Sequence, residues 1–310
     1  MKQTKLLFLM LISLLMSFPL TSCGGDDEPD EPTYEERDYS AKVNGIAYKV
    51  IDTDKLTCEV VAATSPNNYQ GSITIPSKVS INGRDFTVVQ IGDGSFSYSE
   101  IQSISLPNTI EVIEIWAFTS CKKLTSIQFP SSVKKIGVKA FYGSGLTSVT
   151  IPASVEMLGE SSFNRCNNLK EVTIADSKSP LLHISKSASS SQTGAFSGSP
   201  LEVFYIGRNL KCCDESAPST LRYINGYIVD SSDLKQVTIG ADVTTLDNYR
   251  LLYYHFSTFI SKTTSPLNIW NWRFSNEEYM KTKVYVPTAS LERYKENSQW
   301  GKFWNIEAIK

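Results

Sequence analysis

The sequence predicts a β-rich solenoid of about nine coils of 22–23 residues, some with insertions. One pattern is written three times between residues 101 and 168 and begins again at 169–174. Prolines recur 23 and 22 residues apart, at Pro107, Pro130 and Pro152. Phenylalanines recur 22, 23 and 22 residues apart, at Phe96, Phe118, Phe141 and Phe163. Self-similarity at a fixed period in the twenties indicates stacked coils, each of which buries its apolar side only against its neighbours.

The second copy shows how one coil is expected to form. Ile127 and Phe129 alternate with polar residues, which predicts a half-buried strand. Pro130 has no N–H, so it ends the strand and turns the chain. Gly137 is interpreted as relaxing the backbone before Phe141 inserts its ring. Identical residues of neighbouring coils should then form ladders with a spacing of about 4.8 Å.

The same run carries a family resemblance. The stretch LTSIQFPSSVKKIGVKAFYGSGLTSVTIP resembles the BspA-like leucine-rich repeat of bacterial surface proteins, and with degenerate copies the likeness covers roughly residues 71–290. The resemblance implies a leucine-rich-repeat solenoid and, for some members, attachment to host or extracellular-matrix proteins. Only three copies are regular, so no ligand can be carried over residue by residue.

Residues 1–22 are predicted to be a lipoprotein signal peptide. Lys2 and Lys5 precede an apolar stretch, Leu6 to Phe18, that is too short for a permanent membrane span. The sequence LTSC ends at Cys23 and looks like a lipobox, so Cys23 is expected to carry a diacylglycerol that anchors the chain to the membrane. The alternative is ordinary signal cleavage near a chance cysteine.

Residues 23–38 are predicted to be a solvated tether, because GGDDEPDEP combines acidic residues with Gly and Pro and cannot bury a core. The acidic run also resembles the export signal of outer-membrane lipoproteins that reach the cell surface. A plain spacer is the alternative. We therefore expect an outer-membrane lipoprotein that is exposed on the cell surface.

The remaining chain divides into a cap, a solenoid and a second cap. Residues 39–70 read as two alternating strands joined around Asp52–Lys55, which form an N-terminal β-hairpin cap. The solenoid spans 71–287, regular over 101–174 and degenerate over 175–287. An inserted hairpin is expected at Asn82-Gly83, and a long loop at 175–194. Strands are expected near residues 73, 104, 127, 149, 172, 204, 237, 259 and 284.

Residues 288–310 are predicted to form a short C-terminal cap that is helical and aromatic. Ala289 to Glu296 has helical composition. The aromatic and apolar side chains that follow are expected to cover the last coil: Trp300, Phe303, Trp304 and Ile306.

No catalytic or metal motif is present in the sequence, so no enzyme activity and no cofactor or metal are predicted. The two histidines are His183, in the expected loop, and His255. An active site hidden in the irregular half stays open. The net charge of −2 argues against nucleic acid as a partner.

The cysteines that follow Cys23 receive structural interpretations. Cys121 and Cys166 occupy one repeat position two coils apart, about 9.6 Å, beyond disulfide reach. They are expected to be buried as small apolar groups. Cys212-Cys213 is expected in a loop, and a disulfide with a distant cysteine stays open.

Two surfaces are candidates for ligand binding. The first is the strand face, whose outward residues are mostly small and uncharged, with hydroxyls and amides: Gln102, Ser105, Thr125, Gln128, Thr147, Thr150, Glu171, Thr173 and Tyr205. It suits a protein ligand, although any solvated sheet face looks similar. The second holds Trp270 and Trp272, which suit stacking on sugar rings or a divergent core.

The first hypothesis is therefore a monomeric, non-enzymatic surface protein that binds or adheres to a protein ligand. The alternative is a surface glycan-binding lipoprotein that assists polysaccharide uptake.

Overall fold

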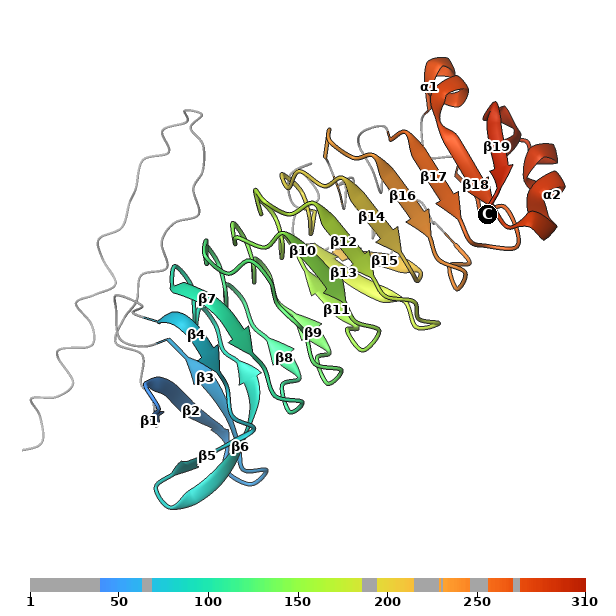
Figure 1. Cartoon of the computed structure of the whole chain (residues 1–310). Coiled ribbons are helices and arrows are strands. Elements are labelled where there is room, and N and C mark those ends of the chain that lie inside the picture. The colour runs from blue at the N-terminus through green and yellow to red at the C-terminus, as the bar shows by residue number, and fades with distance from the viewer. Residues whose placement is uncertain are drawn as a thin grey trace, which may run out of the picture. The chain divides into compact units, whose positions relative to one another are not determined.

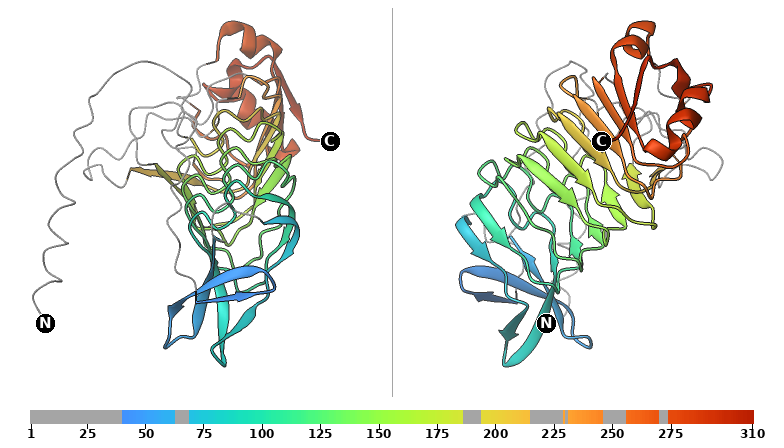
Figure 2. Two further views of the ribbon diagram at one scale, coloured as in Figure 1. Left: turned by 90° about the vertical axis from the view of Figure 1, so that its left-hand side faces the viewer. Right: turned by 45° about the vertical axis from the view of Figure 1, so that its right-hand side comes forward.

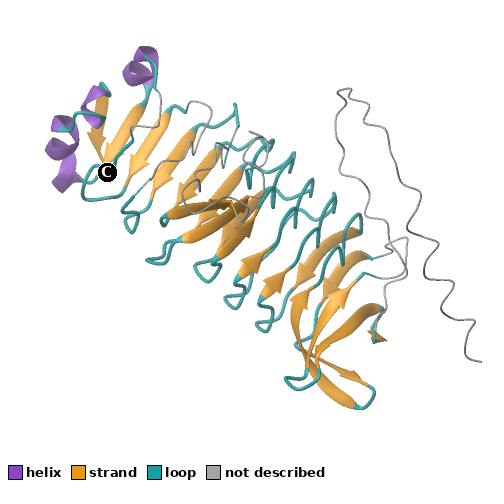
Figure 3. Cartoon of the chain, turned by 180° about the vertical axis from the view of Figure 1, so that it is seen from behind, coloured by secondary structure: helices purple, strands orange, loops and turns teal. Residues whose placement is uncertain are grey.

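A computed structural model describes residues 40–62, 69–185, 194–214, 229, 231–245, 256–269 and 274–310, with backbone alone at 182–185 and 211–214. The chain divides into Met1–Thr33 and Tyr34–Lys310, and every described residue lies in the second unit. Within it the strands follow one another in a row (Figure 1), with the helices at the C-terminal end of the row (Figure 3).

One side of the coil stack is a parallel sheet of seven strands (Figure 2). In order these are β10 (Ser148–Ile151), β12 (Glu171–Ile174), β14 (Val203–Ile206), β16 (Gln236–Ile239), β17 (Thr258–Ser261), β18 (Lys283–Val286) and β19 (Asn305–Ala308). Alternate residues of these strands point inward, as at Val149 and Ile151 in β10. The prediction of strands near 149, 172, 204, 237, 259 and 284 is confirmed.

The other side is a second sheet of ten strands, which the sequence interpretation did not predict. These are β1 (Ala41–Val43), β2 (Ile46–Asp52), β3 (Thr57–Val61), β5 (Lys78–Ile81), β6 (Arg84–Ile91), β8 (Val112–Ile113), β9 (Lys135–Ile136), β11 (Met157–Gly159), β13 (Leu181–Ser185) and β15 (Leu210–Asp214). Several strands have only two or three residues, too few to show an alternating pattern. Each regular coil contributes one short strand to this sheet. That strand contains the Ile or Leu that recurs in every copy: Ile113, Ile136 or Leu158.

A third sheet of two strands, β4 (Gln70–Thr74) and β7 (Glu100–Ser105), continues the first side toward the N-terminus. The strand predicted at 124–129 is wrong, because no strand forms there and β7 is not connected to β10. Phe129 stands where the flanking coils have Leu106 and Ile151, and its ring packs edge-on against Phe141 at 5.6 Å. We attribute the missing strand pairing to the Phe129 side chain, which is larger than Leu106 and Ile151 and is turned inward.

The N-terminal end is closed by antiparallel strands. β2 pairs with β3, and β3 then pairs in parallel with β6 of the coil stack. Two tight turns use residues with positive φ, Asn44-Gly45 between β1 and β2 and Asn82-Gly83 between β5 and β6. The second is the hairpin that the Asn-Gly signal predicts. The Asn44-Gly45 turn divides the first of the two strands predicted within residues 39–70 into β1 and β2.

The C-terminal end combines short helices with aromatic packing. Its helical elements are α1 (Asn276–Lys281), the 3-10 helix η1 (Thr288–Ser290), α2 (Leu291–Glu296) and the 3-10 helix η2 (Trp300–Lys302). Trp300 and Phe303 are buried, as predicted. The prediction that Trp304 covers the last coil is wrong, because its side chain is 75% exposed. The capping box of α1, from Ser275 to Glu278, was not recognised from the sequence.

A ladder of aromatic rings runs through the core. The rings of Phe96, Phe118, Phe141, Phe163 and Phe196 are fully buried. Their consecutive centroids lie 5.3, 4.9, 5.0 and 5.4 Å apart, with interplanar angles of 18° or less. The predicted stacking of phenylalanine on phenylalanine is confirmed.

The residues two before and two after the rings of Phe96, Phe118, Phe141 and Phe163 adopt left-handed backbone conformations. Examples without glycine are Trp116 and Ser120 around Phe118, with φ of 56° at both. This conformation is uncommon for such residues. It turns every second N–H along the coil axis, so that Trp116, Phe118 and Ser120 all donate to carbonyls of the next coil. These bonds offset the local strain.

A polar column lies beside the ring ladder, and it explains the buried cysteines. Cys121 and Cys166 are free and buried, as predicted. The column alternates Ser99, Cys121, Ser144, Cys166 and Ser199. The Cys166 thiol donates to the Phe141 carbonyl at 3.1 Å, and the Ser199 hydroxyl donates to the Phe163 carbonyl at 2.9 Å. Burial raises the pKa of the Cys166 thiol to about 11, so it stays protonated.

Gly137 has a different role from the predicted one. Its φ is not positive, and a Cβ there would lie 2.6 Å from the Glu114 carbonyl carbon. Gly159, in the next coil, would meet the Val138 nitrogen at 2.4 Å. Both glycines therefore allow close approach of consecutive coils.

The loop predicted at 175–194 is interrupted by β13, and the loop predicted around Cys212-Cys213 is replaced by β15. His183 and Cys212 are register partners in these parallel strands. The error arose because LLHIS and LKCCD lack the repeat's Pro and Phe landmarks.

Candidate binding face

The seven-stranded sheet places several of the predicted face residues side by side. Thr150, Thr173 and Tyr205 are successive register partners in β10, β12 and β14. Glu171 lies beside them, as the partner of Ser148. Thr150 and Glu171 are exposed, whereas Thr173 and Tyr205 are half-buried. These four side chains form one continuous outward surface, which is the central part of the nine-residue strand face.

The other predicted residues lie further toward the N-terminus. Gln102 and Ser105 are exposed on β7, and Thr147 is exposed just before β10. Thr125 and Gln128 are exposed in the coil that forms no strand. All nine predicted residues are therefore accessible, but the sheet under them is discontinuous at residues 124–130.

The strand face also extends where the repeat pattern is degenerate. Register continues from Tyr205 to Thr238, Ile260 and Tyr285. Ile260 and Tyr285 are half-buried, whereas Thr238 is buried. The sequence interpretation predicted strands near residues 259 and 284 but did not assign Ile260 and Tyr285 to this face.

Tyr205 is held in a fixed position on this face. Its hydroxyl donates to Asp176 at 2.7 and 2.9 Å from the two carboxylate oxygens. The Lys262 ammonium lies 5.0 Å from the centroid of its ring. Burial, reinforced by the hydrogen bond to Asp176, raises the pKa of the Tyr205 phenol to about 12. Gly240 leaves room here, because a Cβ would lie 3.0 Å from the Tyr205 hydroxyl.

A row of ion pairs lies along the edge where the strands begin. Glu202 pairs with Lys170 at 3.1 Å and with Lys235 at 2.5 Å, across three consecutive coils. Hydrogen bonds from Lys235 and then Lys170 hold the pKa of the Glu202 carboxyl below its ordinary value. An open depression of about 550 Å³ lies here, lined also by Ser232, Asp233 and Ser257. Such exposed pairs favour orientation of a partner more than stability.

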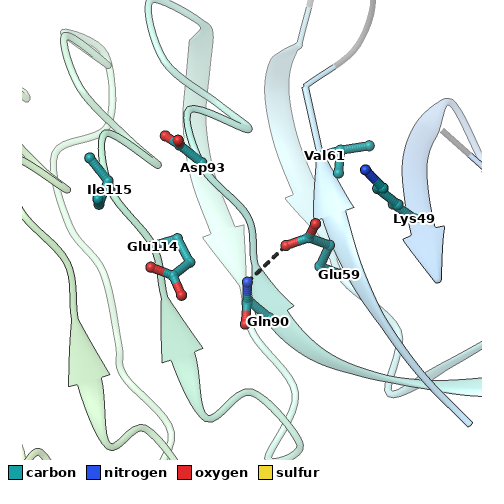
Figure 4. Close-up of a pocket in the computed structure, with 7 residues that line it drawn as sticks. All are labelled: Lys49, Glu59, Val61, Gln90, Asp93, Glu114 and Ile115. Carbon is teal, nitrogen blue, oxygen red and sulfur yellow. Dashed lines mark hydrogen bonds between the residues drawn. The ribbon is translucent and has the colours of Figure 1, made fainter. Parts of the chain in front are cut away.

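A separate pocket of about 390 Å³ lies on the ten-stranded side (Figure 4). Its lining residues are Lys49, Glu59, Val61, Gln90, Asp93, Glu114 and Ile115. The Gln90 amide donates to Glu59 at 2.8 Å, and Lys135 pairs with Glu114 at 3.2 Å. The lining includes no histidine, serine, threonine or cysteine, so it holds no nucleophile with a neighbouring histidine base.

Several sequence predictions lie outside the described residues: Cys23, Trp270, Trp272 and His255. His183, Cys212 and Cys213 are described by backbone alone. Within the described ranges, no three His, Cys, Asp or Glu side chains converge on a point that would hold a metal ion. In the same part of the chain, no helix has the length and apolar composition needed to cross a membrane.

The two-sided stack of short coils, with in-register Phe and Ile ladders, defines a leucine-rich-repeat solenoid. Residues 89–217 match the family described as BspA type leucine rich repeat region, in six copies, so the chain contains a BspA-type leucine-rich-repeat region. The search of curated proteins found no match.

Solved structures with similar folds come from several bacteria. The pneumococcal vaccine antigen PcpA is 17% identical, with coverage of 87% of this chain and 98% of that chain and a TM-score of 0.40. A leucine-rich repeat protein from Bacteroides ovatus is 18% identical, with coverage of 88% and 100% and a TM-score of 0.37. A leucine rich cell surface protein from Faecalibacterium prausnitzii is 18% identical, with coverage of 89% and 96% and a TM-score of 0.40. No residue role is transferred from them.

Proposed function

We propose that this chain is a non-enzymatic surface protein that presents the strand face to a protein ligand, of host or extracellular-matrix type. The observation that carries the proposal is the continuous outward surface of Thr150, Thr173 and Tyr205 across three hydrogen-bonded strands. A sheet whose strands are fixed by a buried ladder loses little conformational entropy on binding, because it is already ordered. The fixed Tyr205 ring supplies the kind of aromatic contact that protein interfaces favour.

The proposal also places the chain at the outer surface of the cell, on a lipid attached to Cys23. The lipobox-like LTSC sequence and the acidic stretch after it support this. Labelled palmitate should be incorporated into the chain and lost in Cys23→Ser. Equal labelling of the two chains would remove the lipid anchor from the proposal.

The binding role is tested with the purified full chain on parallel arrays of host matrix proteins and of glycans. We expect saturable binding to a matrix protein. Binding should fall at least tenfold when four face residues are changed to lysine together: Thr125, Gln128, Thr147 and Thr150. Four new long cations would obstruct a surface whose other residues are mostly small and uncharged.

The matched control changes four exposed, uncharged residues away from this face to lysine: Ser80, Asn108, Ser131 and Ala153. It adds the same charge and should leave binding unchanged. Equal loss in both variants would assign the effect to net charge. Glycan binding that is lost with Trp270→Ala or Trp272→Ala, with no protein bound, would replace the proposal by the glycan-binding alternative.

A further inference from the structure

The strand β4 has an open edge at the N-terminal end of the coil stack (Figure 1). Among the described strands, β4 pairs with β7 alone. The Ile75 N–H donates to the Ser105 carbonyl, just after β4 and at the end of β7, at 3.0 Å. Because the backbone groups of successive residues in a strand point to opposite edges, the N–H and C=O groups of Ser72 and Thr74 point away from β7. Both residues are exposed, so these backbone groups are accessible to another strand.

Two other sheet edges of the described chain are protected in ways that β4 is not. The edge strand β1 has only three residues and exposes Lys42. The edge strand β19 lies against α2, and its residues Ile306 and Ala308 are half-buried. Short length, an edge lysine and a covering helix are devices that prevent an edge from pairing with another chain. β4 has five residues and no charged side chain, so its edge is suited to accept a further strand.

The sequence around β4 indicates which strand this edge accepts. Residues 60–77 contain no Asp, Glu, Lys or Arg, although charged residues make up 20% of the chain. A two-fold axis brings each residue close to its own copy, so a charged residue near such an axis would be repelled by itself. An edge without charge therefore fits a second copy of this chain better than a partner that is recognised by charge.

We propose that two copies of this chain associate by antiparallel pairing of β4 with β4, about a two-fold axis at Ile73. Ser72 of one copy then lies opposite Thr74 of the other, and each such pair exchanges two backbone hydrogen bonds. The two Ile73 side chains, which are half-buried in the single chain, face each other across the axis. The β4–β7 sheets of the two copies become one continuous sheet. This association replaces the monomer that the sequence predicts.

Sedimentation velocity of the purified full chain tests the association. One strand pair buries less than the about 800 Å² per partner of a standard interface. We therefore expect monomers in dilute solution that convert to dimers as the concentration rises from micromolar to millimolar. Copies that share one surface would pair more readily, because their effective concentration is higher.

Charge substitutions on the edge test which surface is used. Ser72→Lys combined with Thr74→Lys should weaken the dimer at least tenfold, because like charges then lie opposite each other. Ser72→Glu combined with Thr74→Glu should do the same. Mixing the lysine and glutamate variants should restore the dimer, since each lysine then faces a glutamate. Thr147→Lys combined with Thr150→Lys is the matched control, because it adds two lysines at exposed positions several coils away, and it should dimerise as the parent does.

Disulfide formation tests the register. In the proposed pairing, the two Cα atoms of position 73 lie about 4.5 Å apart, within the roughly 4.4–6.8 Å that a disulfide spans. Mild oxidation should therefore link two Ile73→Cys chains into a covalent dimer on a non-reducing gel. Ser72→Cys is the matched control, because position 72 is more exposed but faces position 74 of the other copy, and it should not link. The parent, with six cysteines of its own, sets the background.

A chain that stays monomeric at every concentration, with no Ile73→Cys cross-link, would overturn the proposal. A dimer that persists in the lysine variant of Ser72 and Thr74, or that cross-links through Ser72→Cys instead, would contradict the proposed surface or register. A monomer whose lysine variant loses a bound matrix protein would assign the edge to an extended segment of that ligand, and would overturn the proposal too. The Thr147 and Thr150 control keeps the dimer whether or not the strand face binds a protein, so failure of this proposal and failure of the binding role are distinguishable.

Discussion

Phe141→Ala is expected to destabilise the solenoid by about 3–5 kcal/mol, the usual cost of removing a buried phenyl ring. The Phe141 ring is fully buried, with Phe118 and Phe163 stacked on its two faces at 4.9 and 5.0 Å. Phe129 contacts its edge at 5.6 Å. The alanine would leave a cavity that three rings line, and the fixed spacing between coils prevents its collapse.

Denaturant unfolding followed by circular dichroism would measure this loss as a lower unfolding midpoint. Phe129→Ala is the matched control, because the same ring type is removed from a half-buried position in the same coil. It should cost clearly less. Equal losses for the two variants would show that the stacked ladder contributes nothing beyond burial of single rings.

Trp300→Ala is the second substitution with a large expected effect, again about 3–5 kcal/mol. The Trp300 ring is fully buried, stacked on Phe259 at 4.7 Å and edge-on to Tyr294 at 4.9 Å. Its indole N–H donates to the Leu267 carbonyl at 2.7 Å. The substitution therefore removes the packing between α2 and β17 and leaves a carbonyl without its donor.

Trp304→Ala is the control for Trp300→Ala, since the two residues share their type and lie four positions apart. With a side chain 75% exposed, Trp304→Ala should change the stability by no more than about 0.5 kcal/mol. Amide hydrogen exchange should show faster exchange in β17 for Trp300→Ala alone. Unchanged exchange there would contradict a capping role for Trp300.

The repeat made much of the fold predictable, because a strict period translates directly into ladders. Pro107, Pro130 and Pro152 mark three turns, and Phe141 and its equivalents mark the ring stack. The second sheet was not predictable, because β8 and β9 contribute two residues each. The left-handed residues were also hidden, since Trp116 and Lys139 are not types that signal positive φ.

Arg208 illustrates what a repeat pattern cannot encode. Its side chain is fully buried, and it donates to the Pro152 and Ala153 carbonyls at 2.9 and 3.0 Å. It reaches two coils back, past the coil that contains β12. Buried arginine is rare, and no local signal marks a contact 55 residues away. Burial lowers the pKa of the Arg208 guanidinium.

The candidate site was predictable in composition but not in extent. Alternation identified Thr150, Thr173 and Tyr205 as outward residues, and the register brings them together. The fixing of Tyr205 by Asp176 depends on close approach at Gly207 and Gly240, which only the stacked coils reveal. The exposure of Trp304 was missed because an aromatic next to buried Phe303 reads as core.

Site-specific cross-linking tests the binding role of the strand face most directly. A photoreactive side chain is placed at Thr150 on this face or, in a matched chain, at Lys134, which is exposed just before β9 of the ten-stranded sheet. With a bound matrix protein, we predict cross-links from position 150 and none from position 134. Cross-links from position 134 with none from position 150 would place the ligand on the opposite sheet and contradict the proposed function.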